Sequence, residues 1–294
     1  MKYVLGIVWG TYLVLFLGCS GGKYLELTKE VESSYLENDY TKTLERSEQI
    51  IGDVESRGKM ASGEVYFFAG ASAFELEEYD KSLNYLEKAR GQDYYGEEMY
   101  YYLARNYRQI DNLSKEIGSL ESYLGKYPQG KYIGEMRTRL FQTCLESENF
   151  ELADELWAGM DSLSRDNVAN LEVYLNINRI QEKNELCNTL GKRVLDKDAN
   201  NESGLMWFGE TYFWSAENSY LSQMKAYKQN RTHKQYAILL ETFKQVNSDF
   251  RKSRDYFLKL HSLYPKPDYA SYLANIYTRL EDEEKAAYYK KRAE

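Results

Sequence analysis

Residues 97–128 have the sequence EEMYYYLARNYRQIDNLSKEIGSLESYLGKYP, and this stretch decides the fold. Apolar residues recur in it at spacings of three and four, which is the period of an amphipathic helix. One face of each predicted helix collects them: Tyr100, Leu103, Ala104 and Tyr107 on the first, and Ile117, Leu120 and Tyr123 on the second. Pro128 ends the second helix because proline has no amide hydrogen for the next turn. The stretch therefore predicts two short helices joined by a turn.

The same pattern recurs along most of the chain. A shift of 34 residues carries Gly70 of one unit onto Ala104 of the next, and a small residue there lets two helices approach closely. This spacing resembles the tetratricopeptide (TPR) helix-turn-helix repeat. The resemblance implies an all-α TPR α-solenoid of about seven helix-turn-helix units, at residues 24–56, 63–94, 97–128, 134–164, 168–199, 202–265 and 267–294.

The sixth of these units is longer than the others. Between Tyr212 and Phe250 it holds about 32 residues more than a 34-residue unit needs, and the extra sequence keeps the helical spacing. Thr232 and Gln235 have the spacing of a capping box, which restarts a helix. We therefore expect one lengthened helical hairpin (about 205–263), in which each helix gains about 16 residues and projects roughly 24 Å as an arm.

The N-terminal residues 1–18 predict a signal peptide. An apolar stretch of about 15 residues, Tyr3 to Leu17, is too short to span a membrane and has the length of a signal-peptide core. It ends in LFLGCS (15–20), which resembles the lipobox of bacterial lipoproteins at Gly18 and Cys19, although Phe16 stands where an aliphatic residue is usual. The resemblance implies cleavage before Cys19 and a diacylglyceryl thioether plus an N-acyl chain on that residue, followed by a tether over residues 19–23. The alternative is an ordinary secretory signal with an incidental cysteine. Under both interpretations the mature chain is exported.

Charge and the scarcity of reactive groups exclude several classes of function. The net charge of -8 and the pI of about 5.2 argue against nucleic acid, since phosphate binding needs a clustered basic face. The two histidines, His233 and His261, have no ligand-spaced partner, so we expect no metal. No nucleotide motif or acid–base pair is evident, so we expect no cofactor and no enzyme activity. Cys144 and Cys187 fit buried thiols, with a disulfide between them as the alternative.

In TPR proteins the first helix of each unit lines a concave groove, and the resemblance carries this role to particular positions here. Offsets from Gly70, Ala104 and Gly209 give the expected groove set: Phe67, Tyr101, Arg105, Arg108, Gln142, Asn176, Arg179, Met206, Glu210, Trp214, Asn275 and Arg279. Four of these residues are arginines, which leaves two alternatives. Their guanidinium groups could grip carboxylates of a partner through forked hydrogen bonds, or could pair with neighbouring glutamates of the chain itself.

The arm carries four cations, Lys225, Lys228, Arg231 and Lys234, one every three residues across its predicted bend. This spacing moves slowly around a helix and favours a solvated tip. The alternative is docking of the arm at anionic headgroups or at an acidic partner.

The function predicted from these features is that of a non-catalytic, lipid-anchored protein-binding scaffold of the bacterial cell envelope. The junction LGKYPQGKY (124–132) resembles those of outer-membrane assembly lipoproteins and of TPR lipoproteins of the Bacteroidetes envelope. The resemblance implies envelope proteins or a peptide segment as partners, bound through the groove or the arm. Ser20 after Cys19, with no acidic residue directly following, favours the outer membrane, and favours its periplasmic face over the alternative of surface display. The alternative is a carbohydrate-binding lipoprotein of a starch-uptake-like system, in which residues such as Trp214 stack on sugar rings.

Overall fold

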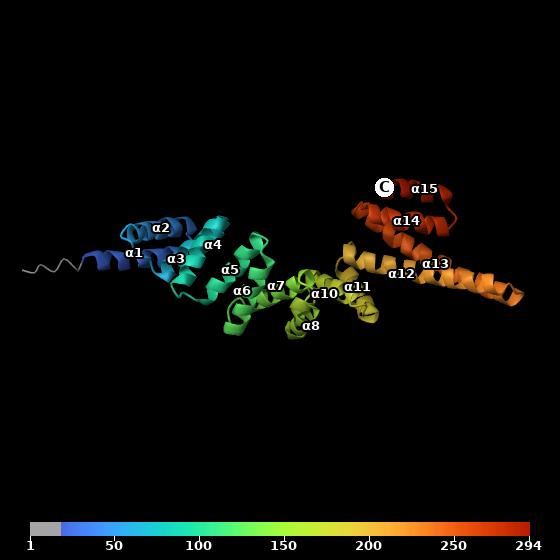
Figure 1. Ribbon diagram of the computed structural model, residues 1–294, viewed down its shortest axis with the longest axis horizontal. Helices are drawn as coiled ribbons and strands as arrows, with labels where there is room; N and C mark the ends of the chain where they lie inside the picture. The colour runs from blue at the N-terminus through green and yellow to red at the C-terminus, as the bar shows by residue number, and fades with distance from the viewer. Residues whose placement is uncertain (1–18) are drawn as a thin grey trace, which may run out of the picture. The chain divides into compact units, whose positions relative to one another are not determined.

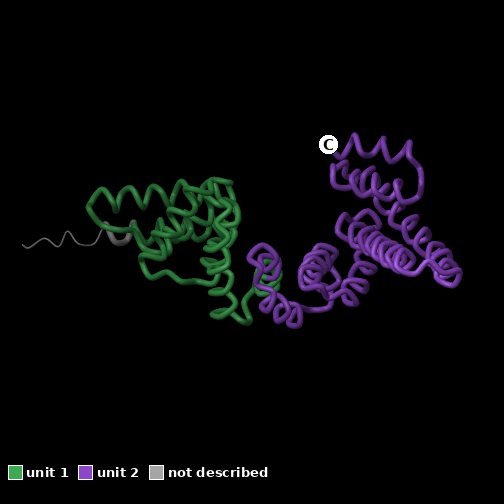
Figure 2. The backbone as a smooth tube through the Cα atoms, turned by 45° about the vertical axis from the view of Figure 1, so that its right-hand side comes forward, with its two compact units in different colours: residues 1–140 green, residues 141–294 purple. Residues whose placement is uncertain are grey.

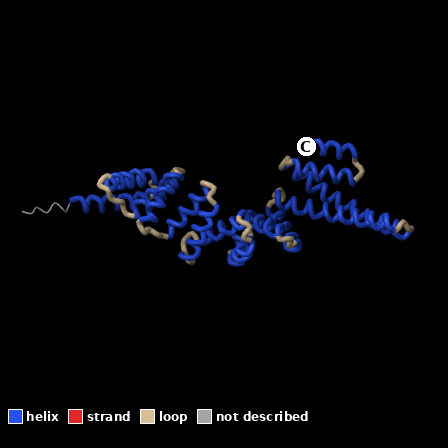
Figure 3. The backbone as a smooth tube through the Cα atoms, in the orientation of Figure 1, coloured by secondary structure: helices blue, strands red, loops and turns tan. Residues whose placement is uncertain are grey.

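The computed structural model describes the backbone of residues 19–294 and the side chains from Tyr24 onward. Every regular element in this described part is a helix, as Figure 3 shows, so the predicted all-α fold is confirmed. The chain forms two compact units, Met1–Leu140 and Phe141–Glu294, which divide within one helix (Figure 2). The signal peptide predicted for residues 1–18 lies outside the described residues, and so does the side chain of Cys19.

The helices pack in consecutive pairs (Figure 1). The first unit contains α1 (Cys19–Leu36), α2 (Tyr40–Glu55), α3 (Gly63–Glu75), α4 (Tyr79–Gly91), α5 (Glu97–Gln109) and α6 (Leu113–Lys126), and α7 (Ile133–Glu146) crosses into the second. The second unit continues with α8 (Phe150–Gly159), α9 (Ser162–Arg165), α10 (Val168–Ile180), α11 (Asn184–Lys197), α12 (Glu202–Gln229), α13 (His233–Leu263), α14 (Pro267–Arg279) and α15 (Glu283–Ala293). Leaving out the one-turn α9, the described helices form seven consecutive pairs, as the repeat pattern predicts; Phe141 of α7 and Trp157 of α8, with ring centroids 5.5 Å apart, join the fourth.

Helix α1 differs from the expected start of the first unit. Residues 19–23, which we expected to form a tether, belong to that helix. Gly21 and Gly22 each disfavour a helix by about 1 kcal/mol, and this local preference is too weak to stop the helix from extending through them.

The turn inside most pairs has a left-handed residue. In six of the described pairs it has a φ of 53–62°: Asn38, Glu77, Asp111, Glu148, Glu182 and Glu281. Just after it, a backbone amide donates to the carbonyl five residues earlier, as Glu78 does to Ala73 at 2.8 Å and Asn112 does to Tyr107 at 2.8 Å. This is the Schellman arrangement that ends a helix and satisfies its last carbonyl groups. The repeated turn sets the same geometry in each pair.

In two of the pairs, α3–α4 and α12–α13, the helices approach closely at a glycine of the first helix. Ser82 Oγ of α4 donates to the Gly70 carbonyl of α3 at 2.7 Å, and Ser253 Oγ of α13 donates to the Gly209 carbonyl of α12 at 2.8 Å. A Cβ atom on Gly70 would lie 3.0 Å from the backbone nitrogen of Leu86. The two bonds span 12 and 44 residues, so the sixth pair holds 44 − 12 = 32 extra residues between equivalent contacts.

Those extra residues lengthen both helices of the sixth pair, as predicted. Helix α12 has 28 residues and α13 has 31, whereas α10 and α11 have 13 and 14. The excess is therefore 15 residues in one helix and 17 in the other. Thr232 Oγ1 accepts a hydrogen bond from the Gln235 amide at 3.2 Å and so caps α13, as the sequence indicates. No helix in the described part of the chain has both the length and the apolar character needed to cross a membrane.

The close approach at Gly70 predicts opposite effects for the same substitution at two glycines. Gly70→Ala is expected to lower the free energy of unfolding by about 1–2 kcal/mol, because the new methyl group meets the backbone of α4. Gly118→Ala in α6 is expected to raise the free energy of unfolding by about 0.5–1 kcal/mol. A Cβ atom added there would have no neighbouring atom from outside its own helical turn within 4 Å, and alanine favours the helix. Urea unfolding of both variants tests this. A gain in stability from Gly70→Ala would contradict the close approach.

Candidate functional site

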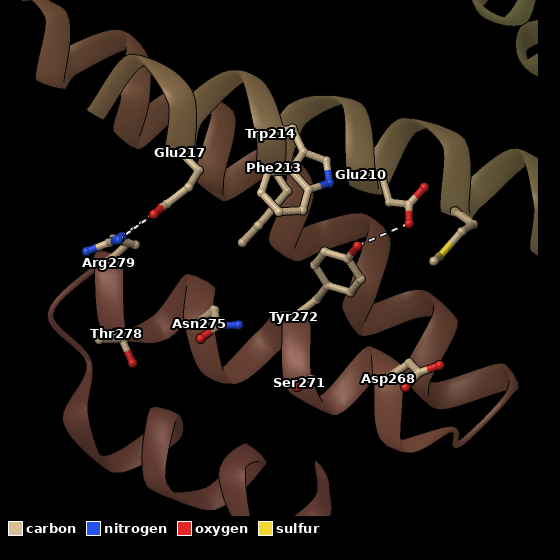
Figure 4. A pocket seen from close by; sticks show the side chains of 11 residues that line it. Glu210, Phe213, Trp214, Glu217, Asp268, Ser271, Tyr272, Asn275, Thr278 and Arg279 are labelled. Atoms are coloured by element: carbon tan, nitrogen blue, oxygen red, sulfur yellow. Dashed lines mark hydrogen bonds and ion pairs between the residues drawn. The ribbon is translucent and has the colours of Figure 1, made fainter. Parts of the chain in front are cut away.

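A cavity of about 710 Å³ opens between two first helices of the second unit, α12 and α14. Figure 4 shows its walls: the side chains of α12 and α14 face one another across it. A second cavity of about 620 Å³ lies between α10 and α12, and Glu210 and Trp214 line both. We refer to the two cavities together as the unit 2 groove; its lining residues are Asn176, Arg179, Ile180, Glu182, Met206, Trp207, Glu210, Phe213, Trp214, Glu217, Asp268, Ser271, Tyr272, Asn275, Thr278 and Arg279.

Three packed aromatic rings form the apolar wall of the cavity between α12 and α14. Phe213 is buried, and its ring meets those of Trp214 and Tyr272 edge-on, with centroids 5.1 and 5.0 Å apart. Trp214, in contrast, is 50% exposed. An exposed indole beside a cavity leaves a large apolar surface in water, and covering such a surface is favourable. Trp214 is therefore the side chain from which a bound segment would gain most.

The groove arginines are held by glutamates of the neighbouring helix. Arg179 Nη2 lies 2.7 Å from Glu210, and the Arg279 guanidinium forms a forked pair with Glu217, in which Nε lies 2.8 Å from the carboxylate. Glu217 raises the pKa of Arg279, because the charged guanidinium gains its hydrogen bonds. In the first unit Arg105 pairs with Glu75 at 3.2 Å. For these three arginines, internal pairing is the alternative that the structure shows.

Tyr272 extends the same network. Its hydroxyl donates to Glu210 at 3.1 Å, so that one carboxylate holds both Arg179 and Tyr272 (Figure 4). Burial, with the adjacent Glu210 adding to it, raises the pKa of Tyr272 to about 12. The hydroxyl therefore stays protonated and donating at neutral pH.

After this pairing the groove keeps negative charge. Its lining contains four carboxylates, Glu182, Glu210, Glu217 and Asp268, and two guanidinium groups, Arg179 and Arg279. Four minus two leaves a charge of -2. Within the described chain, Glu182 and Asp268 have no ion-pair partner, so the excess resides on these two side chains. The groove is thus an acidic, aromatic surface rather than a site for a partner's carboxylates.

The structure brings together only part of the expected groove set. Asn176, Arg179, Met206, Glu210, Trp214, Asn275 and Arg279 all line the unit 2 groove. Gln142 lies on α7 outside these cavities and donates to Asn170 Oδ1 at 3.1 Å. Asn176 is engaged with Ser203 at 3.1 Å, whereas Asn275 is exposed.

The expected positions in the first unit line neither of these two cavities. The guanidinium of Arg105 lies over the Phe74 and Tyr101 rings at 4.4 and 5.0 Å. Arg108 is exposed and has no ion pair within the described chain. Phe67 was expected to face the groove, and that expectation is wrong: it is only 2% exposed, because helices pack around α3 on several sides and bury nearly all of its residues.

Several groove residues were not predicted. Glu217 and Tyr272 lie one helical turn from Trp214 and Asn275, so they share a helix face with expected positions. Asp268 lies one turn before Ser271, which was not predicted either. Continuing the three-and-four spacing beyond the repeat template would have found Glu217 and Tyr272.

The histidines and cysteines of the described chain lie outside this groove. Among the described residues, no three His, Cys, Asp or Glu side chains are grouped as a metal would require. Cys144 and Cys187 are both buried, and no disulfide joins them. The His261 ring packs edge-on against Tyr289, at 5.7 Å between centroids.

Comparisons with known proteins find similarity in fold. No protein-family model matches the chain. No curated protein matches it either. Among solved structures, YrrB, a TPR protein with an unusual peptide-binding site, matches with a TM-score of 0.52 and 12% identity, over 63% of this chain and 93% of that one. The chain has the TPR helical-repeat fold.

Two further structures support this conclusion. A protein from Bacteroides ovatus matches with a TM-score of 0.51 and 16% identity, over 76% of this chain and 100% of that one. The C-terminal part of a TPR repeat-containing protein from Cytophaga hutchinsonii matches with a TM-score of 0.50 and 15% identity, over 90% of this chain and 93% of that one. At these identities the likeness concerns the TPR fold alone.

The ion pair in the groove predicts a measurable coupling. A double-mutant cycle of Arg279→Ala and Glu217→Ala is expected to give a coupling of about 1 kcal/mol, because the pair is forked and its side chains are only 31% and 14% exposed. The matched cycle on Lys244 and Glu241, whose side chains are 75% and 74% exposed, is expected to give no resolvable coupling. Urea unfolding measures both. Equal coupling in the two cycles would show that water screens the groove pair as fully as the surface pair.

Proposed function

We propose that this TPR protein is a non-catalytic scaffold whose unit 2 groove binds an extended segment of a partner protein. The observation that carries the proposal is the half-exposed Trp214 at the junction of two cavities, on a wall shared by three successive first helices. YrrB, which shares the fold, has a peptide-binding site. A long, open groove with an aromatic anchor suits a peptide, because one large side chain can supply much of the binding energy.

The charge of the groove indicates which segments it would favour. Its arginines are occupied by internal glutamates, so a partner carboxylate would have to displace an existing pair. A lysine or arginine side chain would instead meet the uncompensated Glu182 or Asp268, and could lie against the Trp214 ring. We therefore expect the partner segment to carry basic residues next to an apolar one.

A selection from a random peptide library tests this preference. Selected peptides are expected to be enriched in Lys and Arg. Trp214→Ala is expected to weaken their binding at least about tenfold, since the ring is the largest exposed apolar surface of the groove. The control Leu163→Ala removes an 83% exposed side chain on α9, outside the groove, and should leave binding unchanged. Undiminished binding by Trp214→Ala would place the peptide site elsewhere.

A pair of charge variants separates the role of the groove carboxylates from that of overall charge. Glu182→Gln with Asp268→Asn should reduce the enrichment in basic residues. Glu283→Gln with Glu284→Gln makes the same change on exposed positions of α15 and should not.

Carbohydrate binding is the second candidate function. It is favoured by the exposed Trp214 indole and by Ser271, Asn275 and Thr278, whose exposed polar side chains line the same cavity. A glycan array with the wild-type chain and Trp214→Ala distinguishes the two: sugar binding that the variant loses would favour this candidate over the peptide.

The proposed cellular setting is the bacterial envelope, with the chain held by lipid at Cys19 and the outer membrane as its location. The support is the apolar stretch from Tyr3 to Leu17 followed by Gly18-Cys19. Several acyl chains on one residue give firm anchoring, whereas a single chain gives only marginal binding.

Replacing Cys19 tests the anchor. Cys19→Ala is expected to move most of the protein from the membrane fraction to the soluble fraction and to abolish incorporation of labelled palmitate, because no acceptor thiol remains. Cys187→Ala, which removes a buried thiol of the second unit, is the matched control and should keep the label. Label retained by Cys19→Ala would exclude lipid attachment at this residue.

A further inference from the structure

The tip of the arm has a charge opposite to that of the whole chain. We define the arm tip as residues 218–240, the end of α12 and the start of α13. It contains Lys225, Lys228, Arg231 and Lys234 and no aspartate or glutamate, although the chain as a whole has a net charge of -8. All four cations are exposed, and none has an ion pair within the described chain.

The arm tip is held together by contacts between its own two helices. Tyr220 stacks on Phe243 with centroids 5.3 Å apart, Tyr227 lies 5.7 Å from Tyr236, and Leu239 is buried between the helices. The far end of the α12–α13 hairpin extends past α14 and α15 (Figure 1). Its outer faces therefore meet solvent.

One of these outer faces combines apolar and basic side chains. Leu221 directly follows the seam residue Tyr220, and Leu240 directly follows the seam residue Leu239. In an antiparallel pair of right-handed helices, residues just after the seam point to the same side of both helices, because each residue turns by about 100°. Leu221 and Leu240 thus share a face, at 52% and 49% exposure.

Other side chains join the same face through helical spacing. Lys225 and Lys228 follow Leu221 by four and seven residues, and Tyr236 precedes Leu240 by four. We call this set the arm face: Leu221, Lys225, Lys228, Tyr236 and Leu240. Tyr236 is 46% exposed, so three apolar side chains of the face are about half in water.

We propose that the arm face docks on an anionic lipid surface. An interfacial helix face needs apolar side chains that enter the acyl boundary and basic ones whose stems lie along it while their ammonium groups reach the headgroups. Each basic residue near an anionic surface strengthens binding about fivefold. The arm face has both components, and no carboxylate within the arm tip competes with lipid phosphates.

The observations favour lipid over an acidic protein segment. Neither of the two cavities of the unit 2 groove includes a residue of the arm face. The arm face presents basic charge and apolar area on an open surface. Anionic lipid headgroups attract such charge, and the acyl boundary beneath them can cover such apolar area. This docking is separate from segment binding in the groove and does not depend on it.

Hydrogen–deuterium exchange of the full chain with vesicles tests the proposal. The local readout is needed because the apolar residues 3–17 can hold the chain on any vesicle. Phosphatidylglycerol vesicles are expected to slow exchange in residues 218–240 severalfold at low salt, and phosphatidylcholine vesicles are not. Added salt should reverse the protection, since it screens the lysines from the headgroups.

Matched variants separate the arm face from general charge. Lys225→Glu with Lys228→Glu should weaken protection by the anionic vesicles at least about tenfold, because two attractions become repulsions. Lys290→Glu with Lys291→Glu makes the same charge change on exposed positions of α15 and should leave it intact. Leu221→Ser with Leu240→Ser should weaken it without changing the charge. Exchange in α14 reports that each variant is folded.

Three results would overturn the proposal. They are equal protection of the arm tip by both vesicle types, protection that survives Lys225→Glu with Lys228→Glu, and protection by soluble polyglutamate in the absence of protection by anionic vesicles. The last result would assign the arm face to an acidic polypeptide.

Discussion

The α3–α4 pair and the lengthened α12–α13 pair depend on the same close contact between their two helices. A serine of the second helix donates to the backbone carbonyl of a glycine in the first, at Ser82–Gly70 in one unit and Ser253–Gly209 in the other. This contact brings the backbones together only because no side chain separates them. It fixes the pairing so firmly that 32 extra residues leave it unchanged and extend the hairpin beyond it. The arm is thus an elongation of an ordinary pair. The contact within this pair positions α12, which lines the groove and continues into the arm.

The same helix, α12, carries two surfaces of opposite charge. Toward its start, Glu210, Trp214 and Glu217 face the groove. The arginines there form ion pairs with glutamates of the protein, and the lining keeps a net negative charge. Toward its end, Lys225 and Lys228 are exposed without a carboxylate nearby in sequence. Segregation of charge along one helix favours different partners at its two ends and disfavours binding of either partner at the wrong end.

The repeat, the seven pairs and the length of the arm could be predicted from the sequence, because each depends on spacing that is visible in one dimension. Thr232 could be predicted as a cap for the same reason. The left-handed turns at Glu77, Glu148 and Glu182 could not, since glutamate is not a residue that signals positive φ. The pairing of Arg179 and Arg279 also could not, since it depends on which glutamate of the neighbouring helix comes within reach. Phe67 was misplaced because the repeat template does not show how many helices surround α3.

Helix α12 is continuous over 28 residues, with no interruption between the groove and the arm. Trp214 and Lys228 are 14 residues apart in it, which corresponds to about 21 Å along the axis. A straight α-helix cannot shorten or fold between these points without losing backbone hydrogen bonds. The helix therefore fixes the distance between a segment bound at Trp214 and a surface in contact with Lys228. The number of residues between the two positions sets that distance.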